Sequence, residues 1–476
     1  MAKSLNRRDF LKSSGAMVAG SMAAGTLGLS TNAHGSDEDA SVYDVIVVGS
    51  GFAGVTAARN ASQANLRVLH LEASARLGGR TFTSHFAGHD IDLGGSYIGW
   101  GQPHVWAEKM RYQVAIDETA GARATHYVWH NESGERQEGS PDDFWSLMGP
   151  AIDRFYAPAQ EVLPRPYDPL FMHDNHGLDM MSSEEAVNAL GLPLDQRTLI
   201  QTFAAMNGHS DADQSSYLDQ LRWFALSGFN QDFMWDNIGR YKIKGGTQTL
   251  LRKIHEDSRA EFKTGQPVRK VEQVDDRVSV TTARGETFIA KKLILSVPLN
   301  VVSSIEFSPS ISSIKMDTSQ QRHTGSGIKT YIRIKGNHPV MFGQGNQDMP
   351  FTFIWTEYED ENSQILVAYG ISPEQLDTTD AEAIQSAVNQ YFPDTEIIDF
   401  ASYNWNVDPY ALGTWCMYRP GWLTERLEEL QRPEGNIHFA TSDIASGWRG
   451  FIDGAIESGA QAAEQVSVLL KAEADS

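Results

Sequence analysis

Three glycines near the start of the chain have the spacing of a phosphate-binding turn. They close the apolar, β-branched run Asp44–Val48 and lead into the alanine-rich stretch Val55–Asn65, so a strand, a turn and a helix are expected in that order. A turn of this kind lets the backbone approach a pyrophosphate, which then lies at the positive end of the helix dipole. The predicted chemistry is the binding of dinucleotide phosphates, and the expected contacts are Gly49, Gly51, Phe52, Ala53 and Gly54.

A carboxylate follows the second apolar strand. Val68–Leu71 ends at Glu72, which stands 18 residues after Gly54 and can accept hydrogen bonds from a ribose diol. Ala73, next to it, is expected at the same part of the cofactor. A glycine-rich turn in an ordinary α/β domain is the alternative. The strands on both sides and the spacing of the acid favour a dinucleotide-binding domain.

Two further glycine pairs indicate which dinucleotide this is. Arg76–Thr81 and Ile91–Gly99 each contain such a pair, which admits a flat ring close to the backbone, and Arg80 offers a fixed charge to a phosphate. These segments resemble the flavin-containing amine oxidase family, in which the first runs along the FAD pyrophosphate and the second passes the isoalloxazine ring. The resemblance implies FAD, with contacts from Gly79, Arg80, Gly94, Gly95, Ser96 and Tyr97.

The resemblance covers most of the chain. Its further segments are Ile243–Thr247, Pro267-Val268, Leu293–Leu299, Gly327–Lys329 and Gly447–Gly459. The residues around Gln102–Glu108 and Asp453–Ala455 are most similar to the bacterial nicotine oxidoreductase and pseudooxynicotine amine oxidase branch. Asp443 stands where the family usually has glutamate. The resemblance adds as cofactor contacts Val268, Asp443, Trp448, Ile452 and Ala455.

Four residues are implied in the reaction itself. Lys329 occupies the position where the family keeps a lysine bridged to flavin N5 through water. Trp415 and Phe451 lie in segments that supply the aromatic cage of monoamine oxidases, where two ring faces orient the amine and attract its positive charge. Tyr97, beside the second glycine pair, completes the expected set.

The mode of FAD binding is predicted from one position. Thr414 stands where mammalian-type monoamine oxidases attach FAD through a cysteine, so non-covalent FAD is expected. Cys416 is the only cysteine, which excludes an internal disulfide and a cysteine-based metal cluster, and no metal is expected.

The implied reaction is the oxidation of a secondary or cyclic amine, of the nicotine or pseudooxynicotine type, to an imine or iminium by hydride transfer to flavin N5, followed by hydrolysis. An L-amino acid oxidase or another primary-amine or polyamine oxidase is the nearest alternative. L-amino acid oxidases usually carry an arginine after the second glycine pair, where this chain has Ser96-Tyr97-Ile98. A flavin-binding protein without catalysis is the alternative of another class, and Lys329 with the Trp415/Phe451 pair counts against it.

The N-terminus predicts export. Asn6–Lys12 matches a twin-arginine signal, followed by the mildly apolar stretch Ser13–Leu29 and the small-residue site Thr31–Ala33. We therefore expect residues 1–33 to be a signal peptide and the mature protein to be periplasmic. No apolar run of about 18 residues follows, so no membrane span is expected.

The chain is acidic. Loss of residues 1–33 removes four basic residues and one acid, so the formal charge of −22 becomes −25. This charge argues against nucleic acid and would attract a cationic amine or a basic electron-transfer protein, unless it only maintains solubility. The expected electron acceptor is oxygen or a c-type cytochrome, and a second copy of the chain is a candidate partner in a homodimer.

The expected fold class is α/β, with a Rossmann-like FAD-binding domain and an interleaved α+β substrate domain, as in the amine oxidase and p-hydroxybenzoate-hydroxylase-like two-domain fold. Residues 34–41 are expected to be a disordered linker. The FAD-binding domain is predicted at 42–113, 240–303 and 422–470, and the substrate domain at 114–239 and 304–421. Within the latter, apolar spacing predicts helices at 182–190, 195–206, 217–226 and 381–392, and strands at 328–334, 351–356, 365–369 and 400–405.

Overall fold

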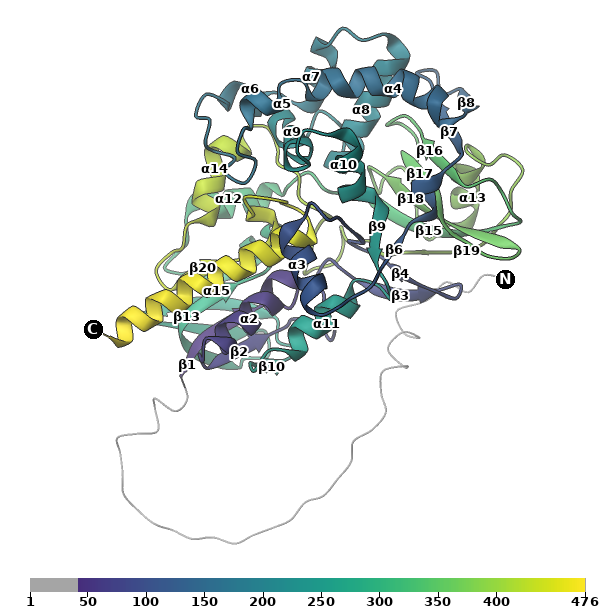
Figure 1. Ribbon diagram of the computed structural model, residues 1–476. Helices are drawn as coiled ribbons and strands as arrows, with labels where there is room; N and C mark the ends of the chain where they lie inside the picture. Colours follow the sequence, from purple (N-terminus) through teal and green to yellow (C-terminus); the bar gives the residue numbers. More distant parts are fainter. Residues whose placement is uncertain (1–41, 476) are drawn as a thin grey trace, which may run out of the picture. The chain divides into compact units, whose positions relative to one another are not determined.

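The computed structural model describes residues 42–475 (Figure 1). The predicted signal peptide, 1–33, and the predicted linker, 34–41, lie outside the described residues. From Tyr43 onward the chain forms one unit built around two large sheets. No helix in the described part of the chain is long and apolar enough to cross a membrane.

The first sheet contains the predicted strand, turn and helix. Its strand order is β10-β2-β1-β13-β12-β11-β14, with β20 beside β13. Around β1 the pairing is parallel, which explains why β1 and β2 are buried on both faces along almost their whole length. The strands are β1 (Tyr43–Val48), β2 (Val68–Leu71), β10 (Glu261–Lys263), β11 (Val268–Val274), β12 (Arg277–Thr282), β13 (Thr287–Leu295), β14 (Glu306–Ser308) and β20 (Ile437–Phe439).

Helices α2 (Phe52–Gln63) and α15 (Ile452–Ala474) lie against each other on this sheet (Figure 1). A Cβ on Gly459 would come within 2.2 Å of the Ala53 carbonyl oxygen, so only glycine permits this approach of the two helices. A Cβ on Gly54 would lie 1.8 Å from the Gly49 oxygen, which explains the third glycine of the turn. Helices α3 (Pro103–Arg111) and α11 (Gln248–Glu256) also pack here.

The second sheet has seven strands and lies in the part of the chain that was predicted to be the substrate domain. Its order is β19-β15-β18-β17-β16-β7-β8, and every pair is antiparallel except β16 with β7. The strands are β7 (His126–His130), β8 (Arg136–Gly139), β15 (Ile328–Lys335), β16 (Met341–Gln344), β17 (Phe353–Glu359), β18 (Ser363–Gly370) and β19 (Ile397–Ser402). Helix α13 (Ala381–Asn389) covers one face through Ile384 and Val388. The opposite face carries Lys329 and Tyr331, as the two-residue repeat of a strand predicts.

Most of the remaining helices come from the segment between β8 and β9. They are α4 (Pro141–Tyr156), α5 (Ala159–Val162), α6 (His176–Met180), α7 (Ser183–Ala189), α8 (Leu194–Gly208), α9 (Tyr217–Leu226) and α10 (Gln231–Trp235). Helix α9 has the predicted bounds, and a capping box of Ser182 with Glu185 starts α7. The remaining helices are α12 (Ser313–Gln321) and α14 (Trp422–Gln431), and the short strands are β3 (Thr83–Phe86), β4 (His89–Asp92), β5 (Tyr97–Ile98), β6 (Ile116–Glu118) and β9 (Tyr241–Ile243).

Two local predictions need correction. The sequence predicted only helices between 114 and 239, but β6, β7 and β8 lie there, because their short and partly polar strands lack a clear apolar alternation. The strand predicted at 400–405 is β19, which ends at Ser402 and leaves Trp405 in a loop. The predicted domain boundary at 303 stays a prediction; β14, which pairs with β11 in the first sheet, begins at Glu306, just after it.

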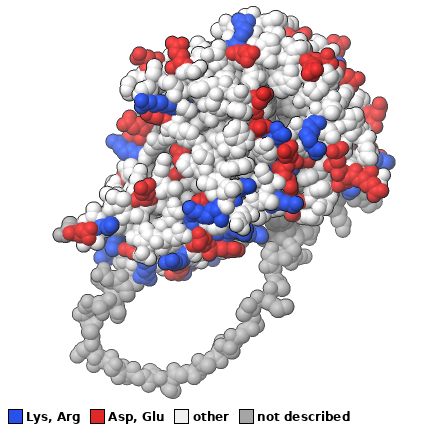
Figure 2. Space-filling model, in the orientation of Figure 1, with Lys and Arg blue, Asp and Glu red and all other residues white. Residues whose placement is uncertain are grey.

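Acidic and basic side chains are interspersed over the face shown in Figure 2.

Candidate active site

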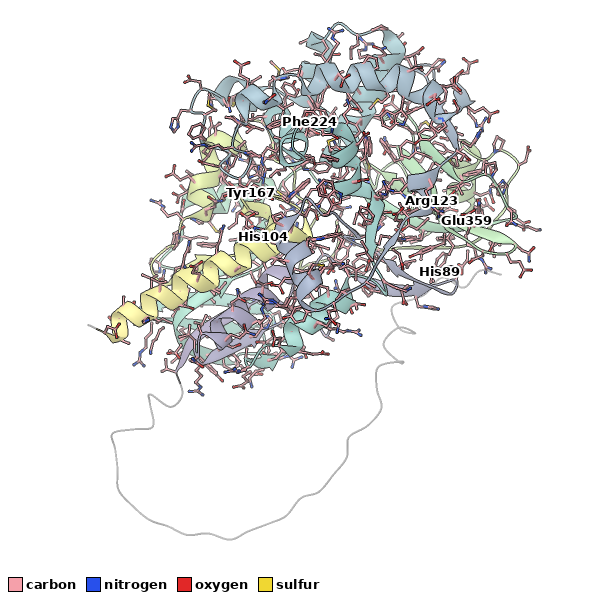
Figure 3. All side chains as sticks on the ribbon, in the orientation of Figure 1. His89, His104, Arg123, Tyr167, Phe224 and Glu359 are labelled. Atoms are coloured by element: carbon pink, nitrogen blue, oxygen red, sulfur yellow. The ribbon has the colours of Figure 1, made fainter. Side chains whose placement is uncertain are left out.

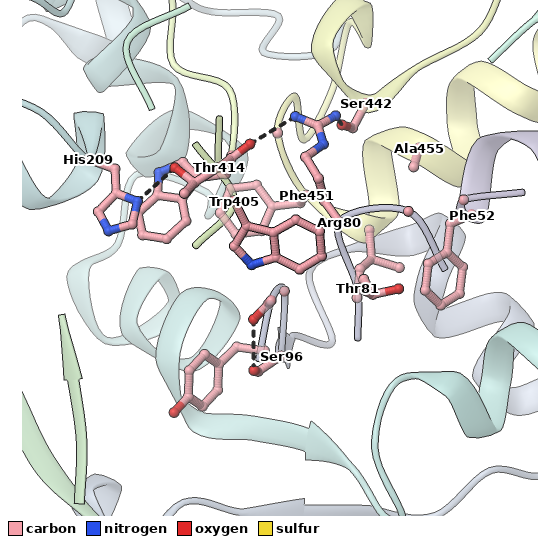
Figure 4. Close-up of a pocket in the computed structure, with 18 of the residues that line it drawn as sticks. Phe52, Arg80, Thr81, Ser96, His209, Trp405, Thr414, Ser442, Phe451 and Ala455 are labelled. Atoms are coloured by element: carbon pink, nitrogen blue, oxygen red, sulfur yellow. Dashed lines mark hydrogen bonds between the residues drawn. The ribbon is translucent and has the colours of Figure 1, made fainter. Parts of the chain in front are cut away.

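A cavity of about 830 Å³ extends from the glycine turn to the second sheet (Figure 4). All but three of the predicted cofactor contacts line it. The exceptions are Gly54, which packs against Gly49, Trp448, which is buried and donates from Nε1 to the Gly101 oxygen, and Asp443. The four residues predicted to take part in the reaction, Lys329, Trp415, Phe451 and Tyr97, all line the same cavity.

The glycine turn fits a pyrophosphate. Gly49 has φ +103°, a conformation that favours glycine, and a Cβ there would meet the Ser296 oxygen at 2.8 Å. Gly51 is the N-cap of α2, with no capping side chain and no acid in the first turn. The first amides of α2 are therefore available to an anion in the cavity, as a dinucleotide phosphate requires.

A second helix begins at the cavity in the same way. Phe451 is the N-cap of α15 and offers no side-chain hydrogen bond, and Ile452 and Ala455 line the cavity. The positive end of this helix dipole suits negative charge on the flavin pyrimidine edge. The residues at these two helix N-termini therefore fit the pyrophosphate and the flavin ring of FAD.

Asp453 in the first turn of α15 faces away from the cavity lining. Its Oδ1 accepts the Val105 backbone N–H at 2.8 Å, which ties α3 to α15. Burial, and next the charge of Glu457, raise the pKa of Asp453 to about 7. His104 and Tyr167 lie near this end of the helix (Figure 3), and His104 Nε2 is 4.0 Å from Glu457 Oε2.

Glu72 lines the cavity where the adenosine ribose is predicted. Its Oε2 accepts the backbone N–H and the hydroxyl of Ser50, at 2.9 and 2.6 Å. Its Oε1 accepts the backbone N–H and the hydroxyl of Ser74, both at 2.7 Å. A ribose diol that binds Glu72 must therefore displace a serine hydroxyl, because a carboxylate has about four acceptor positions.

Arg80 is held by the protein itself. Its guanidinium donates to the Thr414 carbonyl at 2.9 Å, to Ser442 Oγ at 2.9 Å and to Asp443 Oδ1 at 2.6 Å (Figure 4). Burial alone would raise the pKa of Asp443, but the Arg80 charge holds it below its usual value. Arg80 thus joins the Thr414 and Asp443 segments, and its predicted contact with a phosphate stays a prediction.

Lys329 lies at the second glycine pair. Its Nζ donates to the Asp92 carbonyl at 2.7 Å, to the Gly94 carbonyl at 3.0 Å and to Ser96 Oγ. Burial lowers the pKa of Lys329 to about 8, although Asp92 and Glu357 favour its charged form. An amine that titrates near neutral pH therefore lies beside the glycines that are predicted to admit the flavin ring. The water bridge to N5 stays a prediction.

Trp415 forms one aromatic wall. His209 stacks on it with ring centroids 3.8 Å apart and planes 4° apart, and Trp415 Nε1 donates to the Asn207 carbonyl at 2.8 Å. His209 Nδ1 is 2.8 Å from Thr414 Oγ1, and burial lowers the pKa of His209 to about 3. A neutral imidazole thus backs Trp415, so no cation competes for its ring. Phe451, the other wall, lies edge-on to Trp223 at 5.0 Å.

Further aromatic residues of the cavity were not predicted. Trp355 on β17 and Tyr369 on β18 stack with centroids 5.2 Å apart, and Tyr369 is the direct β-sheet partner of Lys329. Their strands were predicted, but the strand pairing that places them opposite Lys329 was not. His209 and Trp405 gave no signal because neither lies in a recognisable motif.

Comparisons with known proteins agree with this geometry. Residues 52–467 match the family model described as flavin containing amine oxidoreductase. A pseudooxynicotine dehydrogenase from a Pseudomonas species is 41% identical, over 98% of this chain and 96% of its own length. The nicotine dehydrogenase of Pseudomonas putida is 36% identical, over 98% of both chains.

Solved structures show the same fold. Putrescine oxidase bound to putrescine has a TM-score of 0.78 at 22% identity, and the match covers 90% of this chain and 99% of that one. Cyclohexylamine oxidase from Brevibacterium oxydans has a TM-score of 0.76 at 17% identity, with 90% of this chain and all of that one covered.

Proposed function

The chain belongs to the family of flavin-containing amine oxidoreductases, and we propose that it oxidises a nicotine-like secondary or cyclic amine, of the nicotine or pseudooxynicotine type, to its imine or iminium, which water then hydrolyses. The predicted family, its two-domain flavin fold, FAD as cofactor and an amine-oxidising activity are confirmed by this membership. The observation that carries the substrate proposal is the cavity that joins Lys329 to the Trp415 and Phe451 walls, in a chain similar to two enzymes named for such amines.

When bound, FAD supplies an acceptor for the hydride from the carbon next to the amine nitrogen. The chain's own residues bind and orient the amine. The rings of Trp415 and Phe451 attract a protonated amine and direct it toward the glycine-rich end of the cavity. The amine must lose this proton to solvent before its carbon can give up a hydride, because an ammonium nitrogen has no lone pair to form the C=N bond. Lys329 Nζ, with its pKa near 8, holds or releases a proton beside Gly94. The N-terminus of α15 favours negative charge at its end of the cavity.

An L-amino acid is a poorer fit for this cavity. Its carboxylate needs a cation, but the position after the second glycine pair holds Ser96, not an arginine. The Ser96 hydroxyl accepts a hydrogen bond from Lys329 Nζ. The guanidinium groups in the lining already have carboxylate partners: Arg80 pairs with Asp443 and Arg240 with Asp236. Among the described residues, both guanidinium groups of the lining are therefore paired, and its aromatic walls suit a pyridine-bearing amine better.

A substrate panel tests this proposal. Anaerobic reduction of the purified flavoprotein by pseudooxynicotine, nicotine, putrescine and an L-amino acid is measured from the bleaching of the flavin absorbance. Pseudooxynicotine or nicotine is expected to reduce the flavin at least about tenfold faster than the other two, the equivalent of about 1.4 kcal/mol. Faster reduction by putrescine or by the amino acid would contradict the substrate assignment.

We further propose that the mature protein is periplasmic and passes its electrons to a c-type cytochrome faster than to oxygen. The twin-arginine sequence Asn6–Lys12 and the formal charge of −25 without residues 1–33 support this proposal, because basic cytochromes are attracted to an acidic protein. A homodimer remains a candidate assembly. Stopped-flow reoxidation of the reduced enzyme by air-saturated buffer or by cytochrome c at two ionic strengths is the test. The cytochrome rate is expected to be the higher one and to fall with salt.

Oxygen rates typical of an efficient oxidase, without acceleration by cytochrome, would contradict the proposed acceptor. The acidic surface would then serve solubility alone.

A further inference from the structure

A buried carboxylate lies directly behind the cavity wall that faces Lys329. Glu357 on β17 has no exposed side-chain surface and does not belong to the cavity lining. It accepts four hydrogen bonds: from Tyr97 Oη at 3.0 Å, Thr119 Oγ1 at 2.5 Å, Trp355 Nε1 at 3.2 Å and Lys242 Nζ at 2.6 Å. Three separate segments of the chain, β5, β9 and the loop after β6, therefore meet at one carboxylate on β17.

Three of these donors belong to residues that line the cavity, namely Tyr97, Thr119 and Trp355. A hydroxyl has one hydrogen to donate and two lone pairs to accept. Since Tyr97 and Thr119 direct their hydrogens to Glu357, what they can offer to the cavity is oxygen lone pairs. Trp355 likewise offers its ring face, because its only N–H is already bonded.

The same wall contains Tyr369 on β18, whose ring stacks on that of Trp355. Lys329 adds no donor, because its Nζ already donates to Asp92, Gly94 and Ser96.

The charges keep this orientation constant near neutral pH. Burial alone would raise the pKa of Glu357, but the Lys242 charge brings it below its usual value, so Glu357 stays an acceptor. Burial, and next the charge of Glu357, raise the pKa values of Tyr97 and Tyr369 well above 10, so both keep their hydrogens. Lys242 also lies 3.9 Å from the centre of the Tyr358 ring, on the side of Glu357 away from the lining.

We propose that Glu357 is a positioning residue that makes this wall of the cavity an acceptor of hydrogen bonds, and that the wall thereby selects amines that present an N–H group. A secondary amine, or a protonated tertiary one, meets this requirement, and a quaternary ammonium does not. The proposal rests on the proposed function, since it takes the substrate to be an amine. It goes beyond that function because it names the N–H group of the amine as the recognised feature and Glu357 as the residue that orients the acceptors.

The test compares two ligands of the FAD-loaded enzyme that differ in this group. One is pseudooxynicotine, whose affinity is obtained from the concentration dependence of anaerobic flavin reduction. The other is its quaternary trimethylammonium analogue, measured as a competitive inhibitor of that reduction. The wild type is expected to prefer the secondary amine at least about tenfold, as a hydrogen bond to a charged group implies.

Two variants should remove most of that preference. Tyr97→Phe deletes the acceptor oxygen and keeps the ring. The double variant Lys242→Met with Glu357→Gln removes both buried charges together, so that neither is left unpaired, and frees the hydroxyls to turn. In each, the preference is expected to fall to within about threefold, mainly through weaker binding of pseudooxynicotine. The limiting rate of reduction in the double variant should change less than the affinity.

Tyr391→Phe is the matched control. Its hydroxyl is also buried and donates to the Phe351 carbonyl at 2.6 Å, but it lies outside the cavity lining, so the preference should stay at the wild-type value. A tenfold preference retained in both Tyr97→Phe and the double variant overturns the inference, as does an equal loss in the control. If no amine reduces the wild-type flavin, the proposed function fails, and this inference fails with it. If amines reduce it but the preference never changes, only the inference fails.

Discussion

Replacement of Trp415 by alanine should slow flavin reduction by the amine while FAD stays bound. The indole is fixed on one face by His209, at 3.8 Å between ring centroids, and at its edge by the Asn207 carbonyl, at 2.8 Å from Nε1. The fixed ring can therefore orient a cationic amine without losing much freedom of its own. A desolvated cation–π contact contributes about 2 kcal/mol. Its loss corresponds to a rate roughly 30-fold lower.

The assay is anaerobic stopped-flow reduction over a range of amine concentrations, which separates the limiting rate from the affinity. Trp415→Phe is the control: it keeps a ring face on His209 but loses the bond to Asn207, so its limiting rate should stay within about fivefold of the wild type. Phe451→Ala should act in the same direction as Trp415→Ala. Wild-type reduction kinetics in both alanine variants would refute the placement of the aromatic walls.

Three other outcomes are expected. Heat or acid should release all the FAD into the supernatant, because Thr414 cannot form a thioether, and flavin that stays on the denatured chain would contradict this. Lys329→Met should slow reoxidation at least about tenfold with little effect on reduction, checked by stopped-flow mixing of the reduced enzyme with its acceptor, and unchanged reoxidation would exclude that role. Asp453→Asn should become more stable relative to the wild type as pH rises from about 4 to 7, because only the wild type must then ionise a buried carboxyl whose folded pKa is raised. Urea unfolding at several pH values should show a difference in unfolding free energy of up to about 4 kcal/mol that is constant above pH 7. A difference that does not depend on pH would contradict this prediction.

The local part of this architecture could be predicted from the sequence. The glycine turn, the carboxylate after β2 and helix α9 depend on residues close together in the chain, where spacing and periodicity carry the information. The common face of Lys329 and Tyr331 also follows from the strand repeat alone. The relatives of the chain supplied the roles that spacing cannot give.

The contacts that complete the site could not be predicted in this way. His209 and Thr414 are 205 residues apart, and Tyr97 and Glu357 are 260 apart. No local pattern encodes which strand lies beside which, and one residue of register would turn Tyr369 away from Lys329. The charge of Arg80 was evident in the sequence, whereas its partner Asp443 depends on the packing of the α15 segment.

The most direct test of an FAD-dependent amine oxidoreductase with a nicotine-like substrate is an anaerobic titration of the purified protein with pseudooxynicotine. Each amine molecule delivers two electrons, so about one equivalent per FAD is expected to bleach the flavin completely and to yield the imine or its hydrolysis product. A flavin that remains oxidised in excess pseudooxynicotine and in excess nicotine, in protein that is folded and fully loaded with FAD, would contradict the account.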